Sequence, residues 1–179
     1  HGRGSSLPKP IKHLLRSKPG IWDLPELPEI GSPFTSTGAV AESQKESALR
    51  FGVERAWYGV NGATGLLQVA ILSLVAPGKA ILMPRNVHRS LISACAIGNI
   101  TPVLFDLPFL EDRGHFAQPD ENYFHKVLSQ LSTSFDISAV ALVNPSYQGY
   151  SVSLDKIIET AHQRGWPVLV DEAHGFHFS

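Results

Sequence analysis

Three clusters of polar and small residues each follow an apolar run, and each carries groups that can do chemistry. The first is Asn61-Gly62-Ala63-Thr64-Gly65, which leads into a helical pattern. Free backbone N–H groups and the positive end of the dipole make such a helix start a phosphate site, to which Thr64 adds a hydroxyl. The alternative is that Thr64 only caps the helix and the glycines only turn the chain. Neither G-x-G-x-x-G nor a P-loop is present.

The second cluster runs from Pro84 to Ser90 and contains His88. An imidazole there can stack on an aromatic ligand or transfer protons. The alternative is a histidine that lies on the surface or caps a helix.

The third cluster is Val168-Leu169-Val170-Asp171-Glu172-Ala173-His174-Gly175. The apolar run places Asp171 at the carboxyl end of a strand, with Ala173 and His174 beyond it. A carboxylate there can accept a hydrogen bond from a protonated ring nitrogen or bind a metal. Asp171 could instead cap a loop, although two adjacent carboxylates without a partner cost stability.

Asp-Glu-Ala-His after an apolar strand is also the Walker-B form of certain helicases, in which the Asp holds Mg²⁺ and the Glu acts on water. Such enzymes need a P-loop. Gly78-Lys79 is the only Gly-Lys pair, and it is followed by Ala80 and preceded by Ser73 where the first glycine should stand. We therefore expect neither an ATPase nor a metal site.

Elements that could position these clusters alternate along the chain. The apolar runs predict strands at residues 56–60, 80–83, 102–105, 138–143 and 167–170. Helical patterns lie at residues 42–51, 64–76, 88–97, 120–131 and 154–164. This alternation predicts an α/β fold, a mostly parallel sheet covered on both faces by helices, with ligands bound beyond the carboxyl ends of the strands. Residues 1–40, rich in Gly and Pro, predict an extended arm with one short helix near 11–16.

Composition narrows the class of protein. Apolar residues make up 43% and charged residues 17%, with 15 Lys and Arg against 16 Asp and Glu, so we expect neither a nucleic-acid nor a membrane partner. Cys95 is the single cysteine, which predicts no disulfide and a reducing, cytoplasmic location. No apolar stretch is long enough to span a bilayer. We expect both His1 and Ser179 to be points within a longer protein.

Seven motifs follow one another along the chain: His1-Gly2-Arg3-Gly4, Asp23-Leu24-Pro25-Glu26-Leu27-Pro28-Glu29-Ile30, Phe51-Gly52, Val60-Asn61-Gly62-Ala63-Thr64-Gly65, Arg85-Asn86-Val87-His88-Arg89-Ser90, Pro145-Ser146-Tyr147-Gln148-Gly149 and Val170-Asp171-Glu172-Ala173-His174-Gly175. In the order and spacing of these motifs the chain resembles the ornithine/lysine/arginine decarboxylase family, pyridoxal-phosphate (PLP) enzymes of the aspartate aminotransferase-like fold type I.

The resemblance implies a role for each cluster. Ala63, Thr64 and Gly65 would bind the cofactor phosphate. His88 would stack on one face of the pyridine ring and Ala173 on the other. Asp171 would pair with the pyridine nitrogen and keep it protonated, and His174 would lie near the Schiff-base end. His88, Asp171 and His174 would be the catalytic residues, and residues 41–179 would form the front part of the cofactor-binding large domain.

The implied reaction is loss of CO₂ from the α-carbon of arginine, lysine or ornithine, giving a polyamine-type amine. The family's Schiff-base lysine lies in a Ser-Thr-His-Lys motif downstream of the Asp-Glu-Ala-His strand. None of the seven lysines matches it, so we expect this chain alone to be inactive. The chain also departs from the family at Gly31, where an acidic residue is usual, and at Ser146, where Thr is usual.

Other functions stay open at this point. Another carbanion chemistry, such as transamination or side-chain lysis, would use the same cofactor-binding residues and give a different product. A non-catalytic remnant that binds or regulates a full-length homologue is a third possibility. The resemblance further implies a homodimer or higher homo-oligomer, and a sheet ending at its fifth strand would leave an unpaired edge.

Overall fold

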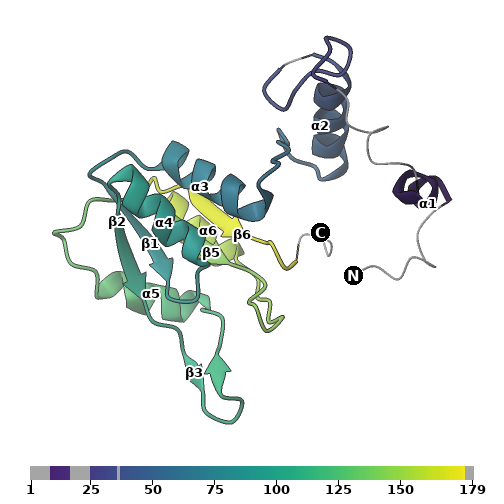
Figure 1. The fold of residues 1–179 in the computed structure, drawn as a ribbon. Coiled ribbons are helices and arrows are strands. Elements are labelled where there is room, and N and C mark those ends of the chain that lie inside the picture. The colour runs from purple at the N-terminus through teal and green to yellow at the C-terminus, as the bar shows by residue number, and fades with distance from the viewer. Residues whose placement is uncertain (1–8, 17–24, 36, 176–179) are drawn as a thin grey trace. The chain divides into compact units, whose positions relative to one another are not determined.

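The computed structural model describes residues 9–16, 25–35 and 37–175 (Figure 1). They form two compact units, one within residues 1–58 and one within 59–179, and each is described by itself. The motif His1-Gly2-Arg3-Gly4 and the first residues of the next one, Asp23-Leu24, lie outside the described residues. The predicted boundary between residues 40 and 41 stays a prediction.

A four-stranded parallel sheet forms the centre of the second unit, in the order β2-β1-β5-β6. Its strands are β1 (Ala80–Pro84), β2 (Thr101–Phe105), β5 (Ile137–Val143) and β6 (Val168–Asp171). Strand β1 pairs with β2 and β5, and β5 pairs in turn with β6, where Val143 aligns with Asp171. Strand β1 is buried along its whole length, as expected for a central parallel strand.

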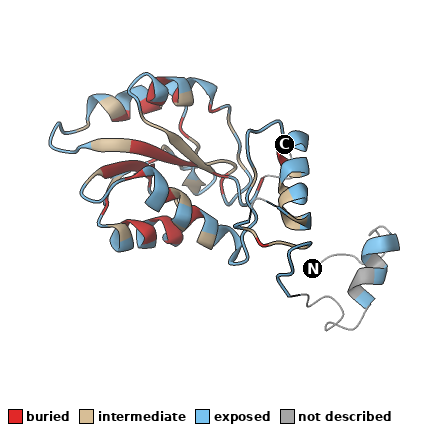
Figure 2. Cartoon of the chain, turned by 90° about the horizontal axis from the view of Figure 1, so that it is seen from above, coloured by how far each residue is buried: buried red, intermediate tan, exposed pale blue. Residues whose placement is uncertain are grey.

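Helices cover both faces of this sheet, so the unit has three layers (Figure 2). Helices α3 (Gly62–Leu74) and α4 (Arg89–Gly98) pack on one face, and α5 (Glu121–Ser129) and α6 (Asp155–His162) on the other. Side chains alternate along β1: Ile81 and Met83 join the first core, and Leu82 joins the second. Buried Cys95 belongs to the first core, and loss of solvent raises the pKa of its thiol.

The predicted α/β class and parallel sheet are confirmed, as are four of the five predicted strands. The strand predicted at residues 56–60 is wrong, because these residues join no ladder. An apolar run becomes a strand only when a neighbouring strand satisfies its backbone groups, and periodicity does not report that neighbour. The predicted alternation is also too regular, because the chain between β2 and α5 makes an extra hairpin.

That hairpin consists of β3 (Phe109–Leu110) and β4 (His115–Phe116), paired antiparallel. Phe109 packs edge to face against Phe116, with ring centroids 5.3 Å apart. Figure 1 shows the hairpin extending away from the four-stranded sheet. Two residues per strand give too little alternation for a sequence pattern to predict it.

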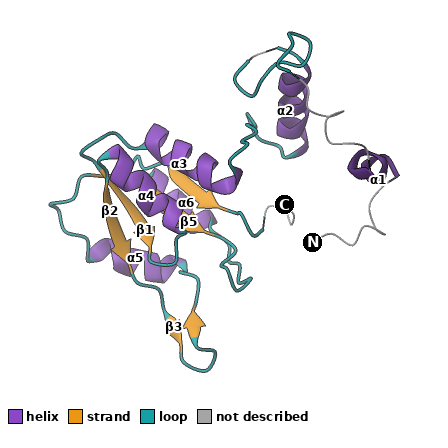
Figure 3. Cartoon of the chain, viewed as in Figure 1, coloured by secondary structure: helices purple, strands orange, loops and turns teal. Residues whose placement is uncertain are grey.

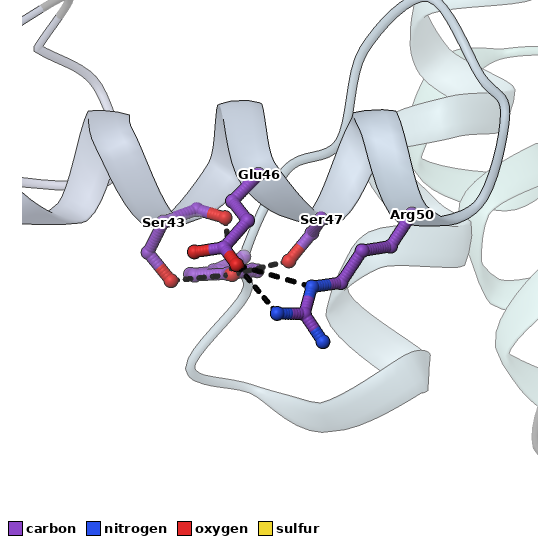
Figure 4. A network of polar contacts seen from close by, with 5 residues as sticks. Ser43, Glu46, Ser47 and Arg50 are labelled. Carbon is purple, nitrogen blue, oxygen red and sulfur yellow. Dashed lines mark hydrogen bonds and ion pairs between the residues drawn. The ribbon is translucent and has the colours of Figure 1, made fainter.

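The first unit contains α1 (Lys9–Arg16) and α2 (Ala39–Arg50). Tyr58 returns to α2, where its hydroxyl donates to the Ser43 carbonyl at 3.0 Å. Its oxygen lies 2.8 Å from Ser43 Oγ and 2.7 Å from Ser47 Oγ (Figure 4). Hydrogen bonds from these two hydroxyls lower the pKa of Tyr58. Tyr58 is therefore bonded to α2 and not to a neighbouring strand.

Gly31, the departure from the resembled family, lies in a turn with φ of +71°. A Cβ there would meet Thr35 Oγ1 at 2.8 Å and overlap the Thr37 carbonyl oxygen. Both the backbone conformation and the space therefore require glycine at this position. Within the described part of the chain, no helix is long and apolar enough to cross a membrane.

Candidate functional site

The clusters at residues 84–90 and 168–175 follow the carboxyl ends of the parallel strands β1 and β6, and the cluster at residues 61–65 begins α3. Figure 3 shows these helices and strands with the loops between them. Helix α3 begins at this edge and contacts β6, and α4 begins just beyond the end of β1. The topology agrees with a placement of residues 61–65, 84–90 and 168–175 at one edge of the sheet, and their joint role stays a prediction.

The first turn of α3 presents unpaired backbone donors. Its N-cap is Asn61, whose side chain makes no capping hydrogen bond. The N–H groups of Gly62, Ala63 and Thr64 therefore have no partner inside the helix, and the first bond of the helix is from Gly65 N to Asn61 O, at 3.4 Å. Thr64 is the third residue of the helix and is exposed. It is not the cap, so its hydroxyl is available to a ligand.

His88 is the N-cap of α4. Its Nδ1 accepts a hydrogen bond from Ser90 N at 3.2 Å and lies 2.9 Å from Ser90 Oγ. The cap anticipated as the simpler explanation for His88 is therefore present. It occupies only an edge of the imidazole, and the side chain is exposed. The ring faces remain able to stack on a planar ligand.

Asp171 ends β6 and is only 6% exposed. Its Oδ1 accepts a hydrogen bond from Ala173 N at 3.1 Å, so the carboxylate does cap its own turn. Among the described residues it has no ion-pair partner and no second hydrogen-bond donor. Glu172, the next residue, is exposed. The two carboxylates are thus separated by the alternation of the chain rather than crowded together.

Beyond Asp171 the chain turns sharply and reaches the loop that follows β5. The His174 ring meets the Tyr147 ring edge to face, with centroids 5.2 Å apart and planes at 89°. Gly175 is buried against Pro145, where a Cβ would overlap the proline ring. Ala173, which directly precedes His174, is exposed. This close approach fixes the turn that contains Ala173 and His174.

The loop after β5 is held by residues to which the sequence assigned no role. Asn144 bonds Val152 in both directions, its Nδ2 donating to the carbonyl at 3.0 Å and its Oδ1 accepting from the N–H at 3.1 Å. Gln118 Nε2 donates to the carbonyls of Val143 and Tyr150. The Pro-Ser-Tyr-Gln-Gly motif after a predicted strand was a sequence signal for this loop. No sequence pattern indicated that Gln118 would contact it.

Ser146 is buried, and its hydroxyl accepts a hydrogen bond from Tyr150 N at 3.2 Å. The serine that replaces the threonine usual in the resembled family therefore keeps the hydroxyl that closes this turn.

An ion pair joins the ends of two neighbouring strands. Arg85, directly after β1, and Asp106, directly after β2, form it through Nε and Oδ1, 2.6 Å apart.

Together these groups can bind an anion at α3, stack on a flat ring at His88 and accept a hydrogen bond at Asp171. No group of three or more His, Cys, Asp or Glu side chains that could hold a metal occurs among the residues that the structure describes. The sequence left two partners open for Asp171, a protonated ring nitrogen or a metal, and the choice between them belongs to the proposal below.

Comparison with known proteins gives one family. Residues 21–179 match the profile "Orn/Lys/Arg decarboxylase, major domain". An arginine decarboxylase of Halalkalibacterium halodurans is 31% identical over 179 residues, which is 99% of this chain. The chain spans only about a third of that relative's length, 35%.

Solved structures share the fold at lower identity. The SepCysS–SepCysE N-terminal domain complex matches with a TM-score of 0.65 and 13% identity, over 78% of this chain and 37% of that one. Cystalysin from Treponema denticola, a structure that contains pyridoxal 5′-phosphate, matches with a TM-score of 0.50 and 16% identity. The match covers 62% of this chain and 27% of the cystalysin chain.

Proposed function

The chain belongs to the Orn/Lys/Arg decarboxylase family, and on that premise we propose that the edge of the sheet at Asp171 binds pyridoxal 5′-phosphate. In the whole protein this site would serve decarboxylation of a basic amino acid to the corresponding amine. The relative from Halalkalibacterium halodurans is an arginine decarboxylase, and the family also includes lysine and ornithine as substrates. Cystalysin, which shares the fold, contains the same cofactor.

The observation that carries the proposal is the buried Asp171 carboxylate with a single hydrogen-bond donor. A mostly buried carboxylate that has one donor can accept further hydrogen bonds, and a charged donor stabilises it more than a neutral one. The described residues supply only the Ala173 N–H. A protonated pyridine nitrogen is a cationic donor in a planar ring, and it would give Asp171 a second hydrogen-bond donor.

The rest of the site fits the same cofactor. The N–H groups of Gly62, Ala63 and Thr64 and the Thr64 hydroxyl would hold the phosphate at the positive end of α3. Gly62 is proposed in place of the predicted Gly65, because the Gly65 N–H already donates to the Asn61 carbonyl. His88 would offer a ring face, since its capping bond uses only the Nδ1 edge. Ala173, small and exposed, would allow the opposite face of the ring to lie close to the backbone.

Bound PLP supplies an electron sink for the carbanion left when CO₂ departs. Asp171 would keep the proton on the ring nitrogen and so preserve the sink, because a carboxylate favours the charged form of a neighbouring cation. His174, held edge-on to Tyr147, would lie on the substrate side of the turn and could exchange a proton there.

Pyridoxamine 5′-phosphate tests this site directly. It has the same phosphate and ring but an amine in place of the aldehyde, so it cannot form imines with surface lysines. We expect the chain to bind it in calorimetric titration. Asp171→Asn should weaken binding at least about tenfold, since a hydrogen bond to a charged group contributes about 1.5–3 kcal/mol. Thr64→Val should weaken it about threefold to tenfold.

The matched controls are Glu111→Gln and Thr133→Val, which make the same chemical changes at exposed positions away from the site. Both should bind like the wild type. Equal affinity of wild type and Asp171→Asn, with both variants folded by circular dichroism, would contradict the proposed cofactor site. Incubating the whole protein and PLP with arginine, lysine and ornithine then tests the reaction: release of CO₂ with an amine product supports it, and a keto acid excludes it.

A further inference from the structure

Tyr147 is an exposed aromatic residue on a rigid turn, and none of the proposed cofactor contacts uses it. The Tyr147 side chain is 82% exposed, whereas Ser146 beside it is buried. The turn is closed by hydrogen bonds from Ser146 N to Tyr150 O at 2.8 Å and from Gly149 N to Ser146 O at 2.9 Å. A large ring held in water by an ordered backbone has apolar surface that a ligand can cover.

The position of Tyr147 is tied to Asp171 from two sides. Its ring meets His174 edge to face at 5.2 Å, and Asn144 N donates to the Asp171 carbonyl at 3.1 Å. Tyr147 therefore lies beside the end of β6, on the side of the turn that holds His174. Because the contact with His174 leaves the residue 82% exposed, most of its ring surface is open.

The charges around this ring favour a cationic guest. Residues 137–154 contain no charged side chain, so no cation of this segment competes for the ring. Arg113 lies over Tyr150, 5.8 Å from that ring centroid, and donates to the Tyr150 hydroxyl, so its charge is engaged elsewhere. The ionisable residues at the end of β6 are Asp171, which is assigned to the cofactor, exposed Glu172, which is acidic, and His174, which meets the Tyr147 ring through an edge-to-face contact.

We infer that the open face of Tyr147 receives the cationic end of the substrate side chain, and that the planar guanidinium of arginine suits it best. This inference rests on the proposed function and adds a specificity-determining residue to it. The face of an aromatic ring attracts cations, and a guanidinium also stacks flat on it. A compact ammonium gains less from the same face.

The test uses the chain saturated with pyridoxamine 5′-phosphate and three probes: arginine, lysine and citrulline, the last being an uncharged analogue of arginine. Calorimetry would compare wild type, Tyr147→Phe and Tyr147→Leu. We expect Tyr147→Leu to bind arginine about fivefold more weakly and citrulline with unchanged affinity. Tyr147→Phe should stay within twofold of wild type, since a phenyl face keeps the cation interaction. Arginine should bind more tightly than lysine to the wild type and to Tyr147→Phe, and this difference should disappear in Tyr147→Leu.

Equal losses for arginine and citrulline in Tyr147→Leu would overturn the inference, because they would indicate a role in packing alone. Unchanged arginine affinity in Tyr147→Leu, or no arginine binding by the wild type, would overturn it as well. The cofactor titration distinguishes the two levels. If pyridoxamine phosphate binds and the arginine results fail, only the role of Tyr147 falls; if pyridoxamine phosphate does not bind, the proposed function falls and this inference with it.

Discussion

His88 combines two functions that use different parts of one imidazole. Nδ1 caps α4 through the Ser90 N–H, and the faces of the ring are left for the proposed cofactor. The sequence presented these as competing explanations, surface cap or ligand contact. In the structure His88 caps α4, and this capping bond leaves the faces of its ring open to a ligand. Capping also restricts the ring to one orientation, which would lower the entropy cost of stacking.

Three substitutions separate the two functions of His88. Asn caps helices well, so His88→Asn should keep the free energy of unfolding within about 0.5 kcal/mol and weaken pyridoxamine phosphate binding about fivefold. His88→Phe should do the opposite, retaining most of the binding and losing about 1 kcal/mol of stability. His88→Ala should lose both. Urea unfolding and calorimetry measure the two quantities, and cofactor affinity undiminished in His88→Asn would leave His88 as a cap alone.

Among the elements, the β3–β4 hairpin supports the site from outside the main sheet. Tyr150 links the two: its ring stacks with His115 at 4.6 Å, and its hydroxyl accepts from Arg113 Nη1 at 3.3 Å, which raises the pKa of Arg113. Gln118, just after β4, bonds the carbonyls of Val143 and Tyr150. The hairpin and the loop carrying Tyr147 are thereby one connected piece of structure.

Removing the Tyr150 side chain should release the hairpin. In Tyr150→Leu we expect amide hydrogen exchange at residues 109–116 to accelerate at least about fivefold, since two strands of two residues are marginal alone. Exchange in β1 and β5 should not change. Tyr147→Leu is the matched control, because it removes an exposed tyrosine of the same loop that does not touch the hairpin. Equal exchange in both variants would show that the hairpin is held by other contacts.

Prediction from sequence succeeded where a pattern is long or where topology decides. The apolar runs predicted the strands at residues 80–83 and 138–143. The carboxyl-end rule predicted that Thr64, His88 and Asp171 lie at one edge, and the strand order agrees with this placement. The hairpin and the Gln118 contacts depend on partners distant in sequence, which periodicity does not encode. The same reason explains the error at residues 56–60, where Tyr58 binds the serines of α2 instead of a strand. The contact of Tyr147 with His174 could not be predicted without the close approach of Gly175 to Pro145, which the sequence does not reveal.

For the molecule as a whole, the sheet has an open edge. Strand β6 pairs with β5 on one side, and no strand pairs with its other side among the described residues. Val168, Leu169 and Val170 are half-buried there. An apolar edge with unpaired N–H and C=O groups is a template for pairing with another strand.

We expect the 179-residue chain to associate through this edge in a concentration-dependent way. Sedimentation velocity across a dilution series should show the mass fall toward that of the 19.5 kDa monomer. Amide exchange of residues 168–171 should slow in the associated form, and that of β2, at the opposite edge, should not. A monomer at all concentrations would mean that the edge is covered, and β6 protection in that monomer would locate the cover within the chain.

The strand order has a further consequence, for the timing of folding. Strand β1 lies between β2 and β5, so the centre of the sheet forms only after more than fifty residues following β1 have been made. Among the four described strands β6 is the last in chain order and contributes Asp171, so contacts between distant parts of the chain precede the site. During synthesis the proposed anion-binding turn of α3 is therefore made well before Asp171. A cofactor held by its phosphate alone would gain the proposed Asp171 contact only after β1, β2 and β5 have been made, so its binding would stabilise these strands late.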